Sequence, residues 1–212
     1  GVRPAQQPAL GIHPLAGAIF AGSVWTVGEA PTPLPAIEGG FAAVEAEFIA
    51  RIGAGAGPDK TDWTIEEAAD QIDAVFIGVE LAGSPLSAIN DLGSAVVASD
   101  FGNNGGLVIG PELTDWRNRM DAIKVETIID GVSVGTGGSL SLAGGALESV
   151  RFLLEHCARW GRPLTAGTLI STGAVTGVHR IYAGSESTCV FEGVGEVRCT
   201  VVKAAPHPTQ GK

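Results

Sequence analysis

Hydrophobic and polar residues alternate along several short stretches of the chain, and this period of two is typical of β-strands. The stretch 43–52 shows the pattern, with Val44 and Phe48 on one side and two glutamates on the other. The dipeptide Asp130-Gly131 separates two further stretches and favours a type I′ hairpin turn between them. The strands predicted in this way are residues 43–52, 74–81, 122–129, 132–134, 168–171, 187–192 and 196–202.

Two segments follow a helical pattern instead. Thr64, with Glu67 three residues later, forms a capping box and predicts a helix to about Ile72. A longer helix is predicted from Ala146 to Trp160, because its apolar residues recur at three- and four-residue steps and build one buried stripe. The glycine and the proline that follow end this helix. The predicted stripe consists of Leu147, Val150, Leu153, Leu154, Cys157 and Trp160.

The composition indicates a well-packed, β-rich protein. With 45% hydrophobic and 17% charged residues, the 212-residue chain has ample core-forming material, which excludes a disordered protein. Its 31 glycines are scattered between short β-branched runs, as in a β-rich fold with tight turns. We expect one domain over residues 1–203 and a frayed tail at 204–212. The glycine-rich, polar segment 53–62 is expected to be a mobile loop.

The excess of acidic over basic residues restricts the kinds of partner that the chain can bind. It has 13 Lys and Arg against 23 Asp and Glu, which gives a formal charge of −10. This charge disfavours nucleic acids and anionic membranes, and no apolar run approaches the ~20 residues of a membrane span. We therefore expect no nucleic-acid and no membrane partner. A small anionic substrate would need a local cation, for which a metal ion is the obvious candidate.

The three cysteines, Cys157, Cys189 and Cys199, have no spacing typical of a metal site. An odd number without a secretion signal indicates reduced thiols and a cytoplasmic protein. Cys189 and Cys199 could face each other across a hairpin, but two packed thiols on neighbouring strands are the favoured interpretation.

Several familiar motifs do not fit their context. Residues 131–135 read G-x-S-x-G, but the serine lies inside a predicted strand with no helix after it. Residues 55–61 lack the glycine that a phosphate-binding loop requires before its lysine, and residues 135–137 lack the third glycine of a dinucleotide site. The four histidines are widely separated, and His156 is interpreted as a surface or packing residue rather than a ligand.

The carboxylates carry more information. Glu45 and Glu47 lie two apart on a predicted strand and leave the same face, with Cα atoms about 6–7 Å apart. Two glutamates at this spacing can converge on a hard cation such as Mg²⁺, Mn²⁺ or Ca²⁺. Glu80 ends a very apolar strand, where an unpaired carboxylate is costly. On these residues alone, a shared metal site and a solvated strand face are about equally favoured.

These residues also carry a resemblance to a known family. The segment 44–48 (VEAEF), followed by Val79-Glu80, resembles the E-x-E…E metal motif of the fumarylacetoacetate hydrolase superfamily. Within it, the chain is most similar to the 2-keto-4-pentenoate hydratase and 4-oxalocrotonate decarboxylase branch. The other segments that resemble this branch are residues 11–20, 100–110, 161–173 and 191–195.

The resemblance implies an α+β fold, a mixed β-roll or sandwich with a few peripheral helices. It implies Mg²⁺ or Mn²⁺, with Ca²⁺ as a substitute, bound by Glu45, Glu47 and Glu80. The expected activity is that of a 2-keto-4-pentenoate hydratase, a lyase of aromatic catabolism that acts on 2-oxo-alkenoates through a metal-stabilised enolate. Thr172 and Gly173 are expected beside the substrate, although a Thr-Gly pair at a strand end is more often only a turn.

Other functions stay open at this point. Decarboxylation of a 2-oxo diacid of the 4-oxalocrotonate type, or hydrolysis of an acylpyruvate or fumarylacetoacetate, would use the same metal. A non-catalytic partner subunit and a β-rich protein that binds small ligands without metal are further alternatives. Relatives are commonly oligomeric, so we expect a homo-oligomer in which Phe20, Trp25, Phe41 and Trp63 face subunit partners.

The chain departs from the family pattern in three respects. The family's N-terminal helical segment, with a lysine beside the substrate, has no counterpart in these residues, through truncation or absence. Leu15-Ala16 stands where many hydratases have an acidic residue, and Asn103 and Asn104 stand where some relatives have serine. The metal motif is intact. The general acid or base, however, is not identified from the sequence.

Overall fold

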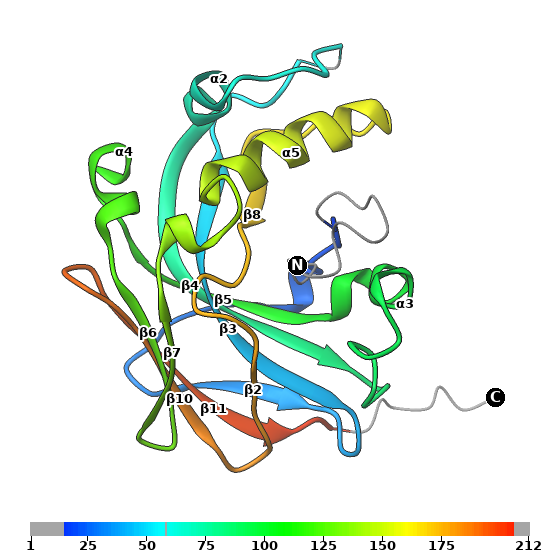
Figure 1. The fold of residues 1–212 in the computed structure, drawn as a ribbon, viewed down its shortest axis with the longest axis vertical. Helices are drawn as coiled ribbons and strands as arrows, with labels where there is room; N and C mark the ends of the chain where they lie inside the picture. Colours follow the sequence, from blue (N-terminus) through cyan, green and yellow to red (C-terminus); the bar gives the residue numbers. More distant parts are fainter. Residues whose placement is uncertain (1–14, 58, 206–212) are drawn as a thin grey trace.

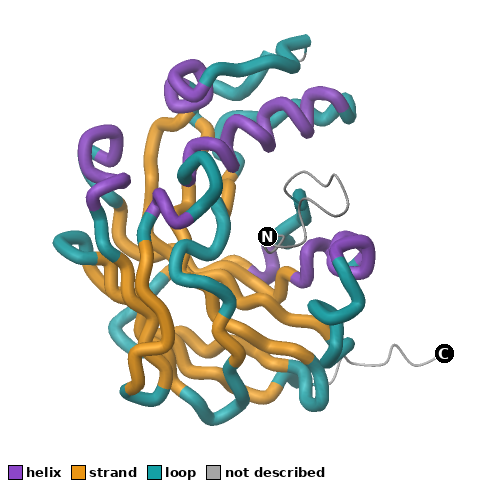
Figure 2. Tube along the Cα trace, viewed as in Figure 1, coloured by secondary structure: helices purple, strands orange, loops and turns teal. Residues whose placement is uncertain are grey.

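The computed structural model describes residues 15–57 and 59–205. Two mixed β-sheets pack against each other, and the helices lie at the periphery (Figure 1). In Figure 2 the helices gather above and to the right of the strands. The expected α+β class, with a mixed β-sandwich and a few peripheral helices, is confirmed.

One sheet carries the three glutamates and is called the carboxylate sheet. Its strand order is β1-β5-β4-β3-β8, and the short β9 also pairs with β3. β1 is parallel to β5, and the other neighbours are antiparallel. The strand bounds are β1 Val24–Thr26, β3 Phe41–Ile52, β4 Ile72–Ser84, β5 Asn104–Glu112, β8 Leu169–Ser171 and β9 His179–Arg180.

The second sheet, called the opposing sheet, has the order β2-β11-β10-β6-β7. β2 is parallel to β11, and the remaining neighbours are antiparallel. The strand bounds are β2 Thr32–Ala36, β6 Val125–Ile129, β7 Val132–Gly137, β10 Glu186–Phe191 and β11 Gly195–Lys203.

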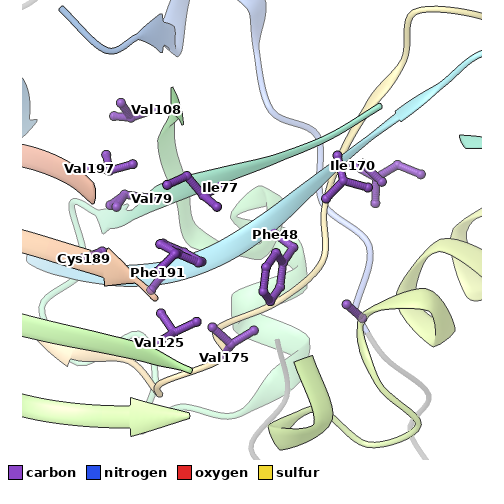
Figure 3. Packing of buried hydrophobic residues seen from close by; sticks show 14 of the residues in the cluster. Phe48, Ile77, Val79, Val108, Val125, Ile170, Val175, Cys189, Phe191 and Val197 are labelled. Atoms are coloured by element: carbon purple, nitrogen blue, oxygen red, sulfur yellow. The ribbon is translucent and has the colours of Figure 1, made fainter. Parts of the chain in front are cut away.

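The main core lies between the two sheets. Val44 and Phe48 of β3 are fully buried, and the Phe48 ring meets Phe191 of β10 edge to face, with ring centroids 5.5 Å apart (Figure 3). Because successive side chains of a strand point to opposite faces, Glu45 and Glu47 leave β3 on the side away from this core.

The helices are short except for α5. Their bounds are α2 Ile65–Asp70, α3 Ser94–Ser99, α4 Trp116–Arg119 and α5 Ala146–Arg159, and short 3₁₀ turns span Ala21–Ser23, Phe101–Asn103, Met120–Ala122 and Ser139–Ser141. The predicted capping box forms, since the Thr64 hydroxyl accepts from Glu67 N–H at 3.1 Å and the Glu67 carboxylate accepts from Thr64 N–H at 3.0 Å.

The end of α5 also follows the prediction. Gly161 adopts a left-handed conformation, with φ of +66°. Its N–H donates to the Ala158 carbonyl at 2.9 Å, and the N–H of Arg162 donates to the Cys157 carbonyl at 2.8 Å. These two bonds form a Schellman motif. The motif fixes the backbone of Arg162 directly beyond the helix.

All the predicted strands are present, with shifted ends. The stretch 122–129 becomes a strand only at Val125, because the residues before it form a 3₁₀ turn and a short connection. The Asp130-Gly131 turn is confirmed, with φ values of +49° and +79°. Strands β1, β2, β5 and β9 and helices α3 and α4 were not among the elements predicted from the periodicity. In β2 two prolines obscure the pattern, but this strand lies at a sheet edge, where proline is tolerated.

The predicted buried stripe of α5 is wrong at one end. Trp160 is 74% exposed and Cys157 is only half-buried, whereas Val150, Leu154 and Ala158 are buried. The period of apolar residues does not distinguish a helix face that packs on the core from a flank that faces an open space.

The expectation that four aromatic residues face subunit partners also fails in part. Phe41 and Trp63 are 6% and 7% exposed because they pack within the chain's own core. Trp25 is half-buried against the core, and Phe20 is exposed.

The cysteines follow the favoured interpretation. Cys189 of β10 and Cys199 of β11 are buried free thiols on neighbouring strands, and their ladder partners are Val197 and Ser187 rather than each other. Burial raises the pKa of the Cys189 thiol to about 11 and that of Cys199 to about 12. Both thiols are therefore packing groups that stay protonated at neutral pH.

Some expectations lie outside the described residues, among them the family-like residues 11–14 and the tail from residue 206. The described parts of the segment 53–62 contain no helix or strand, as the loop prediction requires. No helix in residues 15–57 and 59–205 is both long enough and apolar enough to cross a bilayer.

Replacing Phe191, which is 1% exposed, by Ala should lower the free energy of unfolding. The lost contacts and the remaining cavity predict a loss of about 3–5 kcal/mol, measured by urea unfolding. Leu140 is 69% exposed, so Leu140→Ala serves as the control and should change stability by less than about 0.5 kcal/mol. Equal losses in the two variants would contradict the placement of the core between the sheets.

Candidate metal and substrate site

Two of the glutamates meet across β3 and β4. In the antiparallel register Glu45 of β3 lies directly opposite Glu80 of β4, so their Cβ atoms are about 5 Å apart on one face of the sheet. Glu47 follows two residues later on the same face. The strand pairing thus brings together the three glutamates that the sequence analysis singled out.

The end of β8 and the turn after it hold the Glu47 side chain in place. Glu47 Oε2 accepts a hydrogen bond from Ser171 Oγ and another from the Gly173 N–H at 2.8 Å. Glu47 is only 1% exposed. These donors compensate part of the cost of burying a carboxylate and fix its position.

All three carboxylates are costly to ionise where they lie. Burial, together with repulsion from Glu80, raises the pKa of Glu45 from 4.5 to about 7. Burial and the charges of Glu80 and Glu45 raise the pKa of Glu47 well above 4.5. Burial also raises the pKa of Glu80, against the opposing effect of the nearby Asn104 and Ser171 side chains. Protons or a cation that reduce the charge of the group therefore stabilise it.

β4 is irregular around Glu80. Its register against β5 shifts on both sides of this residue, and such bulges re-aim the side chains next to them. Gly78 lies on the carboxylate face opposite Glu47, where a Cβ would come within 2.2 Å of the Ile49 side chain. The missing side chain at this position lets Ile49 pack beside the carboxylates.

The carboxylate face opens into a cavity of about 500 Å³. Glu47 and Glu80 line it together with residues 171–173. Most of the remaining lining is apolar and comes from residues 15–19, from α5 and from the segment that leads into β8. An apolar cavity with a few convergent polar groups is the usual form of a small-molecule site.

Thr172 and Gly173, predicted to lie beside the substrate, border the cavity, but their polar groups are engaged with the protein. The Thr172 hydroxyl donates to the Phe48 carbonyl at 2.9 Å, and the Gly173 N–H is bonded to Glu47. From α5, Ser149 donates to the Thr172 carbonyl at 2.6 Å. The pair therefore fastens the turn after β8 to β3 and α5, and its contact with a substrate stays a prediction.

A comparison with protein families shows to which family the chain belongs. Residues 4–202 match the family described as fumarylacetoacetate (FAA) hydrolase, C-terminal. The chain belongs to the fumarylacetoacetate hydrolase family. The resemblance inferred from the E-x-E…E motif is thereby confirmed.

Two curated relatives are similar to this chain over part of its length. They are 2-keto-4-pentenoate hydratase of Paraburkholderia xenovorans (strain LB400) and 2-keto-4-pentenoate hydratase 3 of Pseudomonas putida. Each is 31% identical over 137 residues, which are 64% of this chain and 50% of the relative. The chain thus matches about half the length of these relatives.

Solved structures share the fold. The 4-oxalocrotonate decarboxylase from Pseudomonas putida G7, complexed with magnesium and adipate, superposes with a TM-score of 0.80 at 21% identity, over 94% of this chain and 74% of that one. The fumarylpyruvate hydrolase from Pseudomonas aeruginosa, in complex with Mn²⁺ and pyruvate, gives a TM-score of 0.65 at 18% identity, over 87% and 77% of the two chains. At these identities the likeness shows the fold alone.

The donor set of this fumarylacetoacetate hydrolase family member fits a hard divalent cation. Glu45, Glu47 and Glu80 supply only carboxylate oxygens, the ligands that Mg²⁺, Mn²⁺ and Ca²⁺ prefer. Burial raises their pKa values, so a cation beside them would favour the charged carboxylates. In the described part of the chain no three His, Cys, Asp or Glu side chains already enclose a cation position. A cation shared by all three carboxylates would therefore require them to converge further.

The remaining motifs behave as the sequence analysis proposed. Ser133 of the G-x-S-x-G string lies within β7 and faces no helix start. His156 is half-buried and stacks on Phe152, with ring centroids 5.3 Å apart. It lines the cavity as a packing residue.

Several residues of the cavity escaped the sequence analysis. Ser171 is the donor that holds Glu47, but nothing in a short strand sequence distinguishes it from other serines. Phe152 and Arg162 also line the cavity. For Phe152 a signal existed, because it lies four residues before His156 and both are on the flank next to the buried stripe of α5.

The raised pKa of Glu45 predicts how the stability of the metal-free protein depends on pH. Because its folded pKa of about 7 exceeds the unfolded value of 4.5, the stability that Glu45 contributes is fully present below pH 4.5 and is lost as the pH rises through 7. The loss from this residue is about 3 kcal/mol. Urea unfolding in EDTA at pH 5 and pH 8 measures it, and added Mn²⁺ should restore stability at pH 8 but have little effect at pH 5.

The variant Glu45→Gln isolates this contribution. It should be more stable than the wild type at pH 8 in EDTA and should differ much less at pH 5, because the amide carries no charge at either pH. Glu192 is exposed on the surface, so Glu192→Gln is the matched control and should follow the wild type. The prediction is wrong if the gain in stability of Glu45→Gln over the wild type is no larger at pH 8 than at pH 5.

Proposed function

We propose that this chain carries the metal and substrate site of a divalent-metal-dependent lyase that acts on 2-oxo-alkenoates, as a 2-keto-4-pentenoate hydratase does. The observation that carries the proposal is the group of three adjacent glutamates, two of which, Glu47 and Glu80, line a largely apolar cavity. The curated hydratases that match the chain support the same reaction class.

In this proposal Glu45, Glu47 and Glu80 bind Mg²⁺ or Mn²⁺, with Ca²⁺ as a substitute. Structural neighbours with bound magnesium, calcium and manganese support this choice. When bound, such an ion supplies Lewis acidity to the adjacent carboxylate and carbonyl oxygens of a 2-oxo acid. The bound cation would also attract an anionic substrate to a chain whose formal charge is −10.

The chain's own groups orient the site and exclude water. Ser171 and the Gly173 N–H hold Glu47 in place. The Thr172 hydroxyl donates its hydrogen bond to the Phe48 carbonyl. Its oxygen can therefore only accept a hydrogen bond from a substrate, for example from a hydroxyl or enol O–H. The apolar lining keeps bulk water away from the reacting carbons and strengthens these polar contacts.

A second candidate is the decarboxylation of a 2-oxo diacid. The likeness to 4-oxalocrotonate decarboxylase supports it, as does Arg162, a cation at the cavity that could pair with a second carboxylate. Hydrolysis of an acylpyruvate, or a non-catalytic role beside a partner enzyme, are less favoured because neither explains more of the site.

We also propose that the protein is cytoplasmic and forms homo-oligomers. Three free thiols support a reducing compartment. Phe20 and Phe101 are 55% and 52% exposed and pair edge to face, and such exposed aromatic groups are frequent at subunit interfaces.

The test follows the ultraviolet absorbance of dienol substrates with and without divalent ions. Chelation should abolish turnover, and Mg²⁺ or Mn²⁺ should restore it. Glu47→Gln should lower metal-dependent turnover by at least about 100-fold, because it removes a charged ligand from the cation.

Glu192→Gln, on the surface outside the cavity, is the control and should retain full activity. Product analysis separates hydration from decarboxylation and hydrolysis. Full, metal-dependent turnover in Glu47→Gln would rule out the proposed ligand set, and normal Mn²⁺ binding without turnover of any 2-oxo acid would favour the non-catalytic subunit.

A further inference from the structure

The cavity is much larger than the reactive part of the proposed substrate. A five-carbon 2-oxo acid has about eight non-hydrogen atoms, which at roughly the 30 Å³ that a water molecule takes in the liquid would fill at most about half of the 500 Å³. The volume beyond the carboxylates therefore has room for a substituent on the substrate.

One wall of this remaining space is aromatic and comes from α5. Phe152, His156 and Trp160 recur every four residues on one flank of the helix and all line the cavity. The Phe152 and His156 rings stack at 5.3 Å, and the His156 and Trp160 rings lie 6.1 Å apart. The helix thus presents three flat groups in a row, from its middle to the rim at Trp160.

A second wall is formed where residues 15–19 meet Phe101. Phe101 has φ of +51°, an unfavourable conformation for a bulky residue. It is braced by Phe20, edge to face at 5.2 Å, and by Gly17, where a Cβ would lie 2.0 Å from the Phe101 carbonyl oxygen. These contacts keep an apolar ring at the cavity without burying it.

Both walls leave large apolar surface unburied at the same cavity. Trp160 is 74% exposed and Phe101 is 52% exposed, and exposed aromatic surface around one cavity is typical of a ligand site. Glu47 and Glu80 line the same cavity, so a molecule held at these carboxylates by its head would extend along this surface.

We propose that the cavity binds 2-oxo acids that carry an aromatic or similarly flat apolar tail, with the tail against Phe152, His156 and Trp160 and facing Phe101. This inference rests on the proposed function, because the carboxylates and their cation hold the 2-oxo acid head. The aromatic wall of α5 then determines which tails are accepted, and it takes no part in the chemistry at the head.

Arg162 is the one charged side chain on this side of the cavity among the described residues. It lies beyond Trp160, is exposed, and forms no ion pair within residues 15–57 and 59–205. A second carboxylate on the substrate would bind there. The aromatic lining is extended, whereas Arg162 is a single exposed cation, so an apolar tail is favoured over a second carboxylate. The test below distinguishes these two classes of ligand.

The test measures binding by calorimetric titration of the Mn²⁺-loaded protein with three acids. 2-Oxobutanoate has the head without a tail, 2-oxo-4-phenylbutanoate adds an aromatic tail, and 2-oxohexanedioate adds a carboxylate. We expect the aromatic acid to bind at least about tenfold more tightly than 2-oxobutanoate, because its phenyl ring buries apolar surface against the aromatic wall.

Variants locate the tail. Trp160→Ala and Phe152→Ala should each weaken binding of the aromatic acid by about three- to tenfold and leave 2-oxobutanoate unchanged. Tyr182 is a matched control, since it is an aromatic residue, 64% exposed, at a different cavity of about 310 Å³. Tyr182→Ala should bind all three acids like the wild type.

The outcomes separate the two proposals. If 2-oxobutanoate binds only with Mn²⁺ but the aromatic acid binds no better, the tail site is overturned and the proposed function stands. If 2-oxohexanedioate binds best and loses this advantage in Arg162→Gln, the cavity selects a diacid and the apolar-tail proposal is wrong. If no acid binds in the presence of Mn²⁺, both the proposed function and the inference fail.

Discussion

The repulsion between three neighbouring carboxylates is the constraint on which the rest of this structure depends. The pairing of β3 with β4 sets Glu45 opposite Glu80 and places Glu47 beside them on a face that is largely closed to solvent. Like charges at this distance in a low-dielectric environment are unfavourable. The fold tolerates them because the turn after β8 supplies donors to Glu47 and because a proton or a cation can reduce the charge.

The surrounding elements make that turn rigid. Thr172 is bonded to the backbone of β3, and Ser149 of α5 is bonded to the backbone of Thr172. The carboxylates, the turn and the long helix thus form one connected unit. The other face of β3 packs on Phe191 and the opposing sheet, so a single strand couples the stability of the main core to the geometry of the candidate site.

The sequence analysis predicted the parts of this arrangement that local rules determine. A period of two placed Glu45 and Glu47 on one face, and the capping box of Thr64 and the end of α5 at Gly161 follow from short-range hydrogen bonding and backbone conformation. That Glu80 is the exact partner of Glu45 is a matter of strand register, which depends on the whole sheet. The cost of an unpaired carboxylate on an apolar strand made a shared site one of two options, and the resemblance to the family motif favoured that option.

The errors share one physical cause. Trp160 was assigned to the buried stripe and Phe41 and Trp63 to a partner surface, yet Trp160 is exposed beside a cavity and the other two are buried. Apolar character shows that a side chain favours burial, but it does not show which part of the protein or which partner the side chain packs against. Which apolar residues fill the core, and which are left to border an opening, is decided by tertiary packing that no local pattern records.

The helix α5 contributes none of the three carboxylates. It is joined to the turn after β8 through Ser149, near its first turns, whereas its aromatic flank extends toward the opposite end. Changes at Phe152, His156 or Trp160 would therefore leave the acidic floor and its supporting bonds as they are. The aromatic flank can therefore vary in sequence while the acidic floor and the bonds that support it stay the same.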